Sequence, residues 1–85
     1  MEGIDKYLPL GTIVFVKNDI VMRTIVGYLS KNENNEIKDY TTIPFPYGLM
    51  APEIINYYNH EDIEQIIYMG YKNKDFEEFN EILQK

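Results

Sequence analysis

The sequence predicts an α+β fold: a small curled antiparallel sheet of about four strands, a short helical turn and a C-terminal helix. Short runs of β-branched and aromatic residues are separated by turn residues, and one stretch near the C-terminus has helical apolar spacing. A length of 85 residues leaves room for a single domain over residues 1–85. An SH3-like barrel is one form that such a curled sheet can take.

The first two strands are predicted over residues 12–17 and 21–29, where valine, isoleucine, threonine and aromatic residues predominate. Asn18 and Asp19 lie between these runs, and both tolerate the positive φ that a two-residue hairpin turn requires. Gly27 inside the second run indicates a β-bulge or a sharp bend. The sequence therefore predicts a tight hairpin around which the other elements are arranged.

Three further elements are predicted downstream of this hairpin. A polar loop over residues 31–36 leads to a third strand over residues 37–43. Residues 53–58 are expected to be irregular or to form a short edge strand. Asn59 is typical of the N-cap of a single helical turn, and residues 63–71 are predicted to form the next strand.

The C-terminal helix is predicted over residues 76–84, with Asp75 as its N-cap. Phe76, Phe79 and Leu83 fall at positions i, i+3 and i+7, so their side chains share one face. Because so short a helix is marginal alone, it is expected to dock on the sheet or on a partner.

The segment over residues 44–52 is too apolar for an ordinary surface loop. Its three prolines and one glycine prevent a regular strand or helix, yet Phe45, Tyr47, Leu49 and Met50 lie among them. Two interpretations follow from this composition. The segment folds back as a lid that completes a small core, or it stays exposed as a contact surface.

The inventory of reactive side chains argues against an enzyme. The chain has no cysteine, His60 is its one histidine and Ser30 its one serine, and its glycines form no phosphate-binding loop. Glu61 and Asp62 follow His60, but consecutive residues of one helical turn point in different directions and do not converge on an ion. We therefore predict no catalytic residues, no metal site and no cofactor.

The charge of the chain predicts which partners it avoids. The formal net charge is −6, and residues 51–85 alone carry eight acidic and three basic side chains. Acidic surfaces are repelled by phosphate backbones and by anionic membranes, so binding of nucleic acid or membrane is not expected. The polar, acidic first residues predict no signal peptide, and we expect a cytoplasmic protein.

The aromatic content points to a partner-binding surface. Eight tyrosines and four phenylalanines are more rings than the core of so short a chain readily holds, and tyrosine is enriched at binding surfaces. The alternative is that the tyrosines lie half-buried at the sheet edge with their hydroxyl groups in water. The residues predicted to contact a protein partner are Phe45, Tyr47, Leu49, Met50, Tyr57 and Tyr58.

Five short motifs occur in a specific order over residues 7–71: LPLGT, IVGYL, KDY, PFPYGL and NHEDIEQIIYMGY. In this order they resemble the family of small proteins from Gram-positive bacteria known as domain of unknown function 4176. Members of that family are often encoded near type VII secretion clusters and LXG-type toxins. The resemblance supplies no catalytic residues.

The resemblance implies a non-enzymatic accessory that binds an exported type VII toxin as a chaperone or adaptor. A cytoplasmic immunity protein of such a toxin is the alternative. A homo-oligomer is a further alternative, because a sheet that does not close leaves strand edges with which a second copy can pair.

Overall fold

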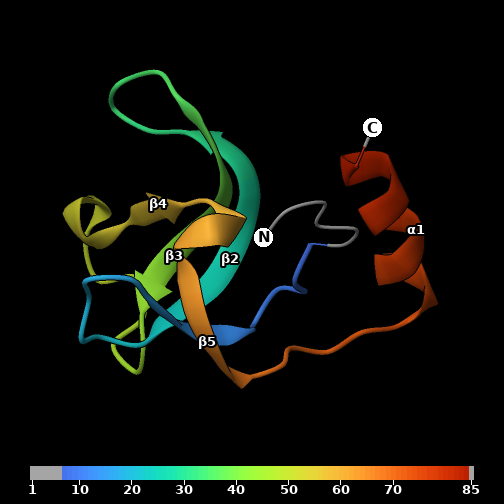
Figure 1. The fold of residues 1–85 in the computed structure, drawn as a ribbon, viewed down its shortest axis with the longest axis horizontal. Helices are drawn as coiled ribbons and strands as arrows, with labels where there is room; N and C mark the ends of the chain where they lie inside the picture. Colours follow the sequence, from blue (N-terminus) through green and yellow to red (C-terminus); the bar gives the residue numbers. More distant parts are fainter. Residues whose placement is uncertain (1–6, 85) are drawn as a thin grey trace.

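The computed structural model describes residues 7–84, which form one five-stranded antiparallel sheet with the strand order β4-β3-β2-β1-β5. Figure 1 shows the sheet curling on itself, with the C-terminal helix set to one side of it. The predicted α+β class is confirmed. The elements in chain order are β1 (Ile13–Val16), β2 (Arg23–Lys31), β3 (Ile37–Pro44), the 3-10 helix η1 (Pro52–Ile54), β4 (Asn56–Tyr58), the 3-10 helix η2 (His60–Asp62), β5 (Ile63–Tyr68) and α1 (Lys74–Leu83).

The most extensive pairing joins β2 to β3. The ladder runs from Arg23 opposite Pro44 to Lys31 opposite Ile37, and its register shifts between Ile25 and Gly27. This shift confirms the bulge predicted at Gly27. A Cβ at Gly27 would lie 3.3 Å from the Cβ of Thr41 on the neighbouring strand, so the glycine also allows the two strands to approach closely.

The predicted two-residue turn between the first two strands is wrong. The ladder between β1 and β2 ends where Val14 pairs with Arg23, so a long connection follows in place of a tight hairpin. Within this connection Asn18 does have the positive φ expected of it, at 64°. The side chain of Asp19 accepts a hydrogen bond from the Val21 amide at 3.0 Å, which favours an open loop over continued pairing.

The two edge strands of the sheet are close in sequence although they lie at opposite ends of the strand order. β4 is the short edge strand considered for residues 53–58, and η2 alone links it to β5 at the other edge. The sheet therefore has five strands, and it curls until one helical turn spans its open side. Since β4 and β5 share no ladder within residues 7–84, the sheet stays open and does not close into a barrel.

The core lies on the inner face of the curl and is small. Four hydrophobic side chains are fully buried: Val14, Val16, Ile25 and Tyr40. Tyr7, Leu8, Tyr28, Tyr58 and Ile63 pack against them. Since so few apolar side chains are fully removed from water, each of them accounts for a large share of the stability.

The C-terminal helix begins earlier than expected, and its cap is a different residue. The side chain of Asn73, not that of Asp75, accepts the hydrogen bond from the Phe76 amide, at 2.9 Å. The helix docks on the first described residues of the same chain, because the buried side chain of Asn80 accepts a hydrogen bond from the Tyr7 amide at 3.0 Å. The ring centroid of Phe79 also lies 6.0 Å from that of Tyr28.

Within residues 7–84, no helix combines the length and the apolar character needed to cross a bilayer.

Candidate binding surface

Apolar side chains gather in solvent at one end of the sheet, where the connections β1–β2 and β3–β4 meet. Ile20 is 93 % exposed, Met50 76 %, Tyr47 66 % and Leu49 62 %, and Phe45 is exposed beside them. We call these five residues the apolar end. Side chains of this size are rarely left together in water unless they bind something.

Backbone hydrogen bonds connect the two loops of the apolar end. The Phe45 amide donates to the Met22 carbonyl at 2.9 Å, which holds the segment after β3 against the loop that carries Ile20. The Gly48 amide donates to the Pro44 carbonyl at 2.9 Å, and Gly48 has a φ of 73°, which suits a glycine in a tight turn. The segment thus turns outward and does not complete the core, so the lid interpretation is wrong.

A largely buried ion pair supports the same end from beneath. Arg23 Nε donates to Asp19 Oδ2 at 3.1 Å, and a second guanidinium nitrogen of Arg23 donates to the Ile54 carbonyl at 3.4 Å. Desolvation acts to raise the pKa of Asp19, but hydrogen bonds from the Val21 amide and from Arg23 outweigh it and lower the pKa. The pair ties the β1–β2 loop to η1, so the apolar end rests on a fixed base.

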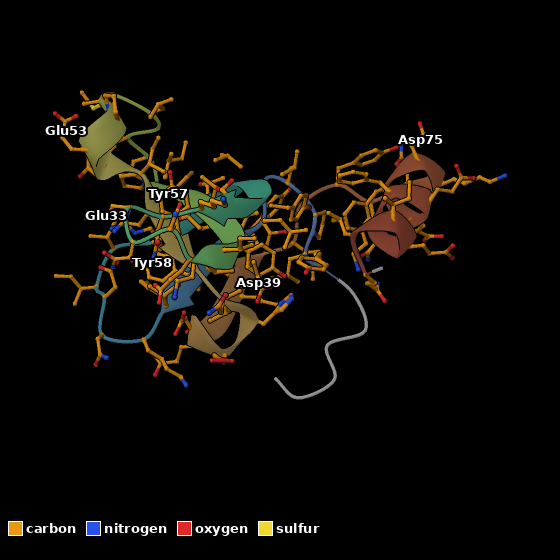
Figure 2. All side chains as sticks on the ribbon, turned by 90° about the horizontal axis from the view of Figure 1, so that it is seen from above. Glu33, Asp39, Glu53, Tyr57, Tyr58 and Asp75 are labelled. Atoms are coloured by element: carbon orange, nitrogen blue, oxygen red, sulfur yellow. The ribbon has the colours of Figure 1, made fainter. Side chains whose placement is uncertain are left out.

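The two tyrosines predicted to belong to the contact surface lie elsewhere. Tyr58 pairs with Tyr40 in the ladder of β3 and β4 and packs against the core. Tyr57 is half-buried opposite Thr41, on the other face of the sheet. Figure 2 shows both tyrosines beside the sheet, between Glu53 at one end of the molecule and Asp75 on the helix α1, and both belong to the edge strand β4. The structure therefore groups Phe45, Tyr47, Leu49 and Met50 but not Tyr57 or Tyr58.

Sequence reasoning missed Ile20, the most exposed of these residues. Ile20 lies between the turn predicted at Asn18 and Asp19 and the strand predicted over residues 21–29, and it received no role in either, whereas the loop that contains it leaves the sheet. The signal that could have found it is Asp19, because aspartate often bonds the backbone two residues on and thereby opens a turn.

The sequence also did not predict a set of hydrogen-bonded polar groups in the interior of the sheet. The hydroxyl of Tyr40 accepts from the Leu8 amide at 2.9 Å and lies 2.9 Å from Nδ1 of His60. The hydroxyl of Tyr28 donates to the Leu8 carbonyl. We call this arrangement, in which two tyrosine hydroxyl groups bind the backbone N–H and C=O of one residue, the tyrosine clamp. It fastens the segment before β1 to the inner face of the sheet.

His60 joins the clamp to β3. Its backbone amide donates to Asp39 Oδ2 at 2.9 Å, and its Nε2 lies 3.7 Å from the same oxygen. The rings of Tyr7 and Tyr40 lie 4.8 Å and 4.9 Å from the imidazole ring. The turn predicted at Asn59 is therefore confirmed, but the histidine in it is a packed, hydrogen-bonded part of the interior.

Burial changes the proton affinities of these groups. Desolvation raises the pKa of Tyr28 to about 12 and also raises the pKa of Tyr40, where the hydrogen bond from Leu8 acts weakly in the opposite direction. Desolvation likewise lowers the pKa of His60, against the attraction of the nearby Asp39 carboxylate. All three groups are thus held in their neutral forms.

The free energy of unfolding is expected to fall on both sides of neutral pH. Above the ordinary tyrosine pKa of 10.0, the unfolded chain loses protons that Tyr28 and Tyr40 keep when folded, so alkali favours unfolding. Below the ordinary histidine pKa of 6.5, the unfolded chain binds a proton that folded His60 resists. Urea unfolding should give the highest midpoint between about pH 7 and 9.

His60→Gln serves as the control for the acid side of this profile. It should flatten the loss of stability just below pH 6.5 and leave the alkaline side unchanged. An unfolding midpoint that stays constant from about pH 8 to 11 would show that the clamp hydroxyl groups are not buried.

A small hollow lies away from the apolar end, between α1 and the segment before β1, with a volume of about 190 Å³. Ligand sites for drug-sized molecules usually start at about 300 Å³. Within residues 7–84, no group of three or more His, Cys, Asp or Glu side chains is placed to hold a metal ion. The apolar end is therefore the surface with the clearest capacity to bind a partner.

Comparison with known protein families gives a match over most of the chain. A family model described as a domain of unknown function (DUF4176) matches residues 7–79, which include all five strands and most of α1. No curated protein and no solved structure matches the chain.

Proposed function

Because the chain belongs to the DUF4176 family, we propose that it is a non-enzymatic accessory protein that binds another polypeptide through the apolar end. The partner we propose is an exported toxin of the LXG type. The chain would hold this toxin in the cytoplasm as a chaperone or adaptor before its export by a type VII secretion system.

One observation carries this proposal: five apolar side chains lie together in water on a base that hydrogen bonds and an ion pair hold in place. A fixed base reduces the entropy lost on binding, because the loops are already ordered. The aromatic ring of Tyr47 and the flexible side chain of Met50 are residue types that interfaces use. The acidic charge of the chain would favour a partner segment that carries lysine or arginine.

The test is a pull-down from the native host, in which this chain is co-expressed with an LXG-type toxin of that host. Tyr47→Ser, Leu49→Ser and Met50→Ser combined are expected to reduce the affinity about ten-fold or more. Because these side chains are exposed, the free energy of unfolding should change by no more than about 0.5 kcal/mol for each substitution.

Ile37→Ser provides a matched control, since Ile37 is also exposed but lies at the opposite end of β3. It should capture the toxin as well as the unchanged chain does. If the triple variant is folded and still binds at full strength, the apolar end is not the binding surface. If the chain neutralises the toxin's activity and has no effect on its export, the immunity alternative replaces the chaperone role.

A further inference from the structure

The edge strand β5 is exposed to an extent unusual for part of a folded sheet. Every residue from Glu64 to Tyr68 is exposed, including Ile66 at 43 %, Ile67 at 42 % and Tyr68 at 61 %. One edge of β5 pairs with β1, and within residues 7–84 no strand pairs with its other edge. Backbone hydrogen-bonding groups and apolar side chains are thus available together along the same strand.

The two edges of the sheet differ in how they are protected. β4 has only three residues, and the 3-10 helix that begins at Pro52 lies just before it. β5 has six residues and contains neither proline nor lysine, the residues that commonly block the edge of a sheet. The protective features it does have are one charged residue near its start, Glu64, and two register shifts against β1. An edge of this kind is suited to pairing with another strand.

The charges on either side of β5 indicate which strand would fit. The acidic residues Glu61 and Glu64 are exposed at its start, whereas Lys72 and Lys74 are exposed beyond its end. The segment between them, over residues 65–71, carries no charge. A suitable partner is a strand that also has acidic residues before it and basic residues after it. If it pairs antiparallel with β5, its basic end lies beside the acidic end of β5. This chain itself carries such a strand.

We propose that two copies of this chain associate through β5, which pairs antiparallel with β5 of the second copy around a two-fold axis. With Ile66 opposite Ile67 of the second copy, the acidic residues at the start of β5 lie toward the lysines beyond the end of the second copy's β5. The two-fold symmetry repeats each contact, so the interface is isologous and closes at a dimer. Residues in the middle of the interface are uncharged, so the net charge of the chain is kept away from the contact.

The outer face of the sheet would become continuous across such a dimer. Tyr68 pairs with Ile13, Ile13 with Thr24 and Thr24 with Ile43, so these side chains form one row across four strands. In the proposed register Tyr68 lies opposite Gln65 of the second copy, whose own partner in β1 is Phe15. Tyr68 would then lie across the junction and lose its exposure. None of the five residues of the apolar end lies on β5, so each dimer would carry two binding surfaces.

The first test is the mass of the full chain in solution, measured by sedimentation velocity over a range of concentrations. The expected species has twice the monomer mass of 10.1 kDa. Ile67→Lys should shift it to the monomer, because a lysine in the middle of the pairing would have to lose its hydration. Circular dichroism will show whether this variant is folded.

Exchanging charges tests the pairing without altering its apolar centre. Glu61→Lys with Glu64→Lys makes both flanks of β5 basic, and Lys72→Glu with Lys74→Glu makes both acidic. Each double variant should dimerise about ten-fold or more weakly on its own, because like charges now meet. Mixing the two variants should restore dimers, and these should contain one copy of each.

The control changes the same charge at a distance from β5. Glu33→Lys with Glu78→Lys alters an exposed loop and the exposed side of α1, and it should leave the dimer intact. A monomeric mass at about 0.2 mM, well above the dissociation constants of stable dimers, would overturn the proposal. A dimer that Ile67→Lys and both charge exchanges leave unchanged would also overturn it, since another surface would then be in use. Neither result would bear on toxin capture by the apolar end.

Discussion

Replacing Tyr40 with alanine is expected to lower the free energy of unfolding by about 4 kcal/mol, the cost of removing a large buried ring. Tyr40 is fully buried at the centre of the core, and its hydroxyl group holds both the Leu8 amide and His60. A loss of this size approaches the whole stability of a small domain, about 5–10 kcal/mol. Thermal unfolding followed by circular dichroism should show a variant that is largely unfolded by about 37 °C.

Tyr40→Phe separates the ring from the hydroxyl group. It keeps the buried ring but leaves the Leu8 amide without its partner, which should cost about 2 kcal/mol. Tyr71→Phe is the control, because Tyr71 is largely exposed and its hydroxyl group can bond water. Equal stability of the Tyr40→Phe chain and the unchanged chain would contradict the structural importance of the tyrosine clamp.

Gly70→Ala adds a single methyl group, and it is expected to lower the free energy of unfolding by about 3 kcal/mol or more. We expect this to be the largest loss that any such small addition causes. A Cβ at Gly70 would meet the carbonyl oxygen of Leu10 and lie 2.9 Å from the amide nitrogen of Thr12. Both are backbone atoms of the segment that enters β1, so neither can rotate away. The Gly70 amide also donates to the hydroxyl of Thr12 at 2.9 Å, a bond that any shift would break.

Gly27→Ala is the matched comparison for Gly70→Ala. Its new Cβ would lie 3.3 Å from the Cβ of Thr41, a contact that a small movement relieves. Thermal unfolding of the two variants should therefore give a much larger drop in Tm for Gly70→Ala. Similar values would show that the end of β5 and the start of β1 do not approach as closely as described.

Elements set by local chemistry could be predicted from the sequence. The bulge at Gly27, the strand over β3 and the turn after Asn59 each depend on side chains that act within a few residues of themselves. The composition of residues 44–52 likewise excluded a regular element. Its prolines and glycine impose their backbone restrictions whatever the rest of the chain does.

Elements that depend on competition between neighbours were predicted less well. Asn73 and Asp75 are both good N-caps, and the sequence alone did not show that the helix begins before Asp75. Asn18 and Asp19 suit a two-residue turn, but Asp19 bonds the Val21 amide and pairs with Arg23, which keeps the loop open. In both cases a side-chain hydrogen bond decided between two acceptable backbones.

The interior network could not be predicted because its members are far apart in the sequence. Leu8, Tyr28, Tyr40 and His60 meet only when the sheet curls, and no spacing in the chain records that contact. The exposure of residues 45–50 has the same origin. Whether an apolar loop covers a core or leaves it depends on how full that core already is, and Tyr7, Tyr28 and Tyr58 already fill it.

The hydrogen bond between Tyr7 and Asn80 also determines when the molecule can be completed during its synthesis. The two residues are separated by 73 positions, so Tyr7 leaves the ribosome long before Asn80 is made. α1 can dock on the segment before β1 only once residues 74–83 have left the exit tunnel. The segment before β1 therefore lacks this hydrogen bond throughout the synthesis of the five strands that lie between the two residues.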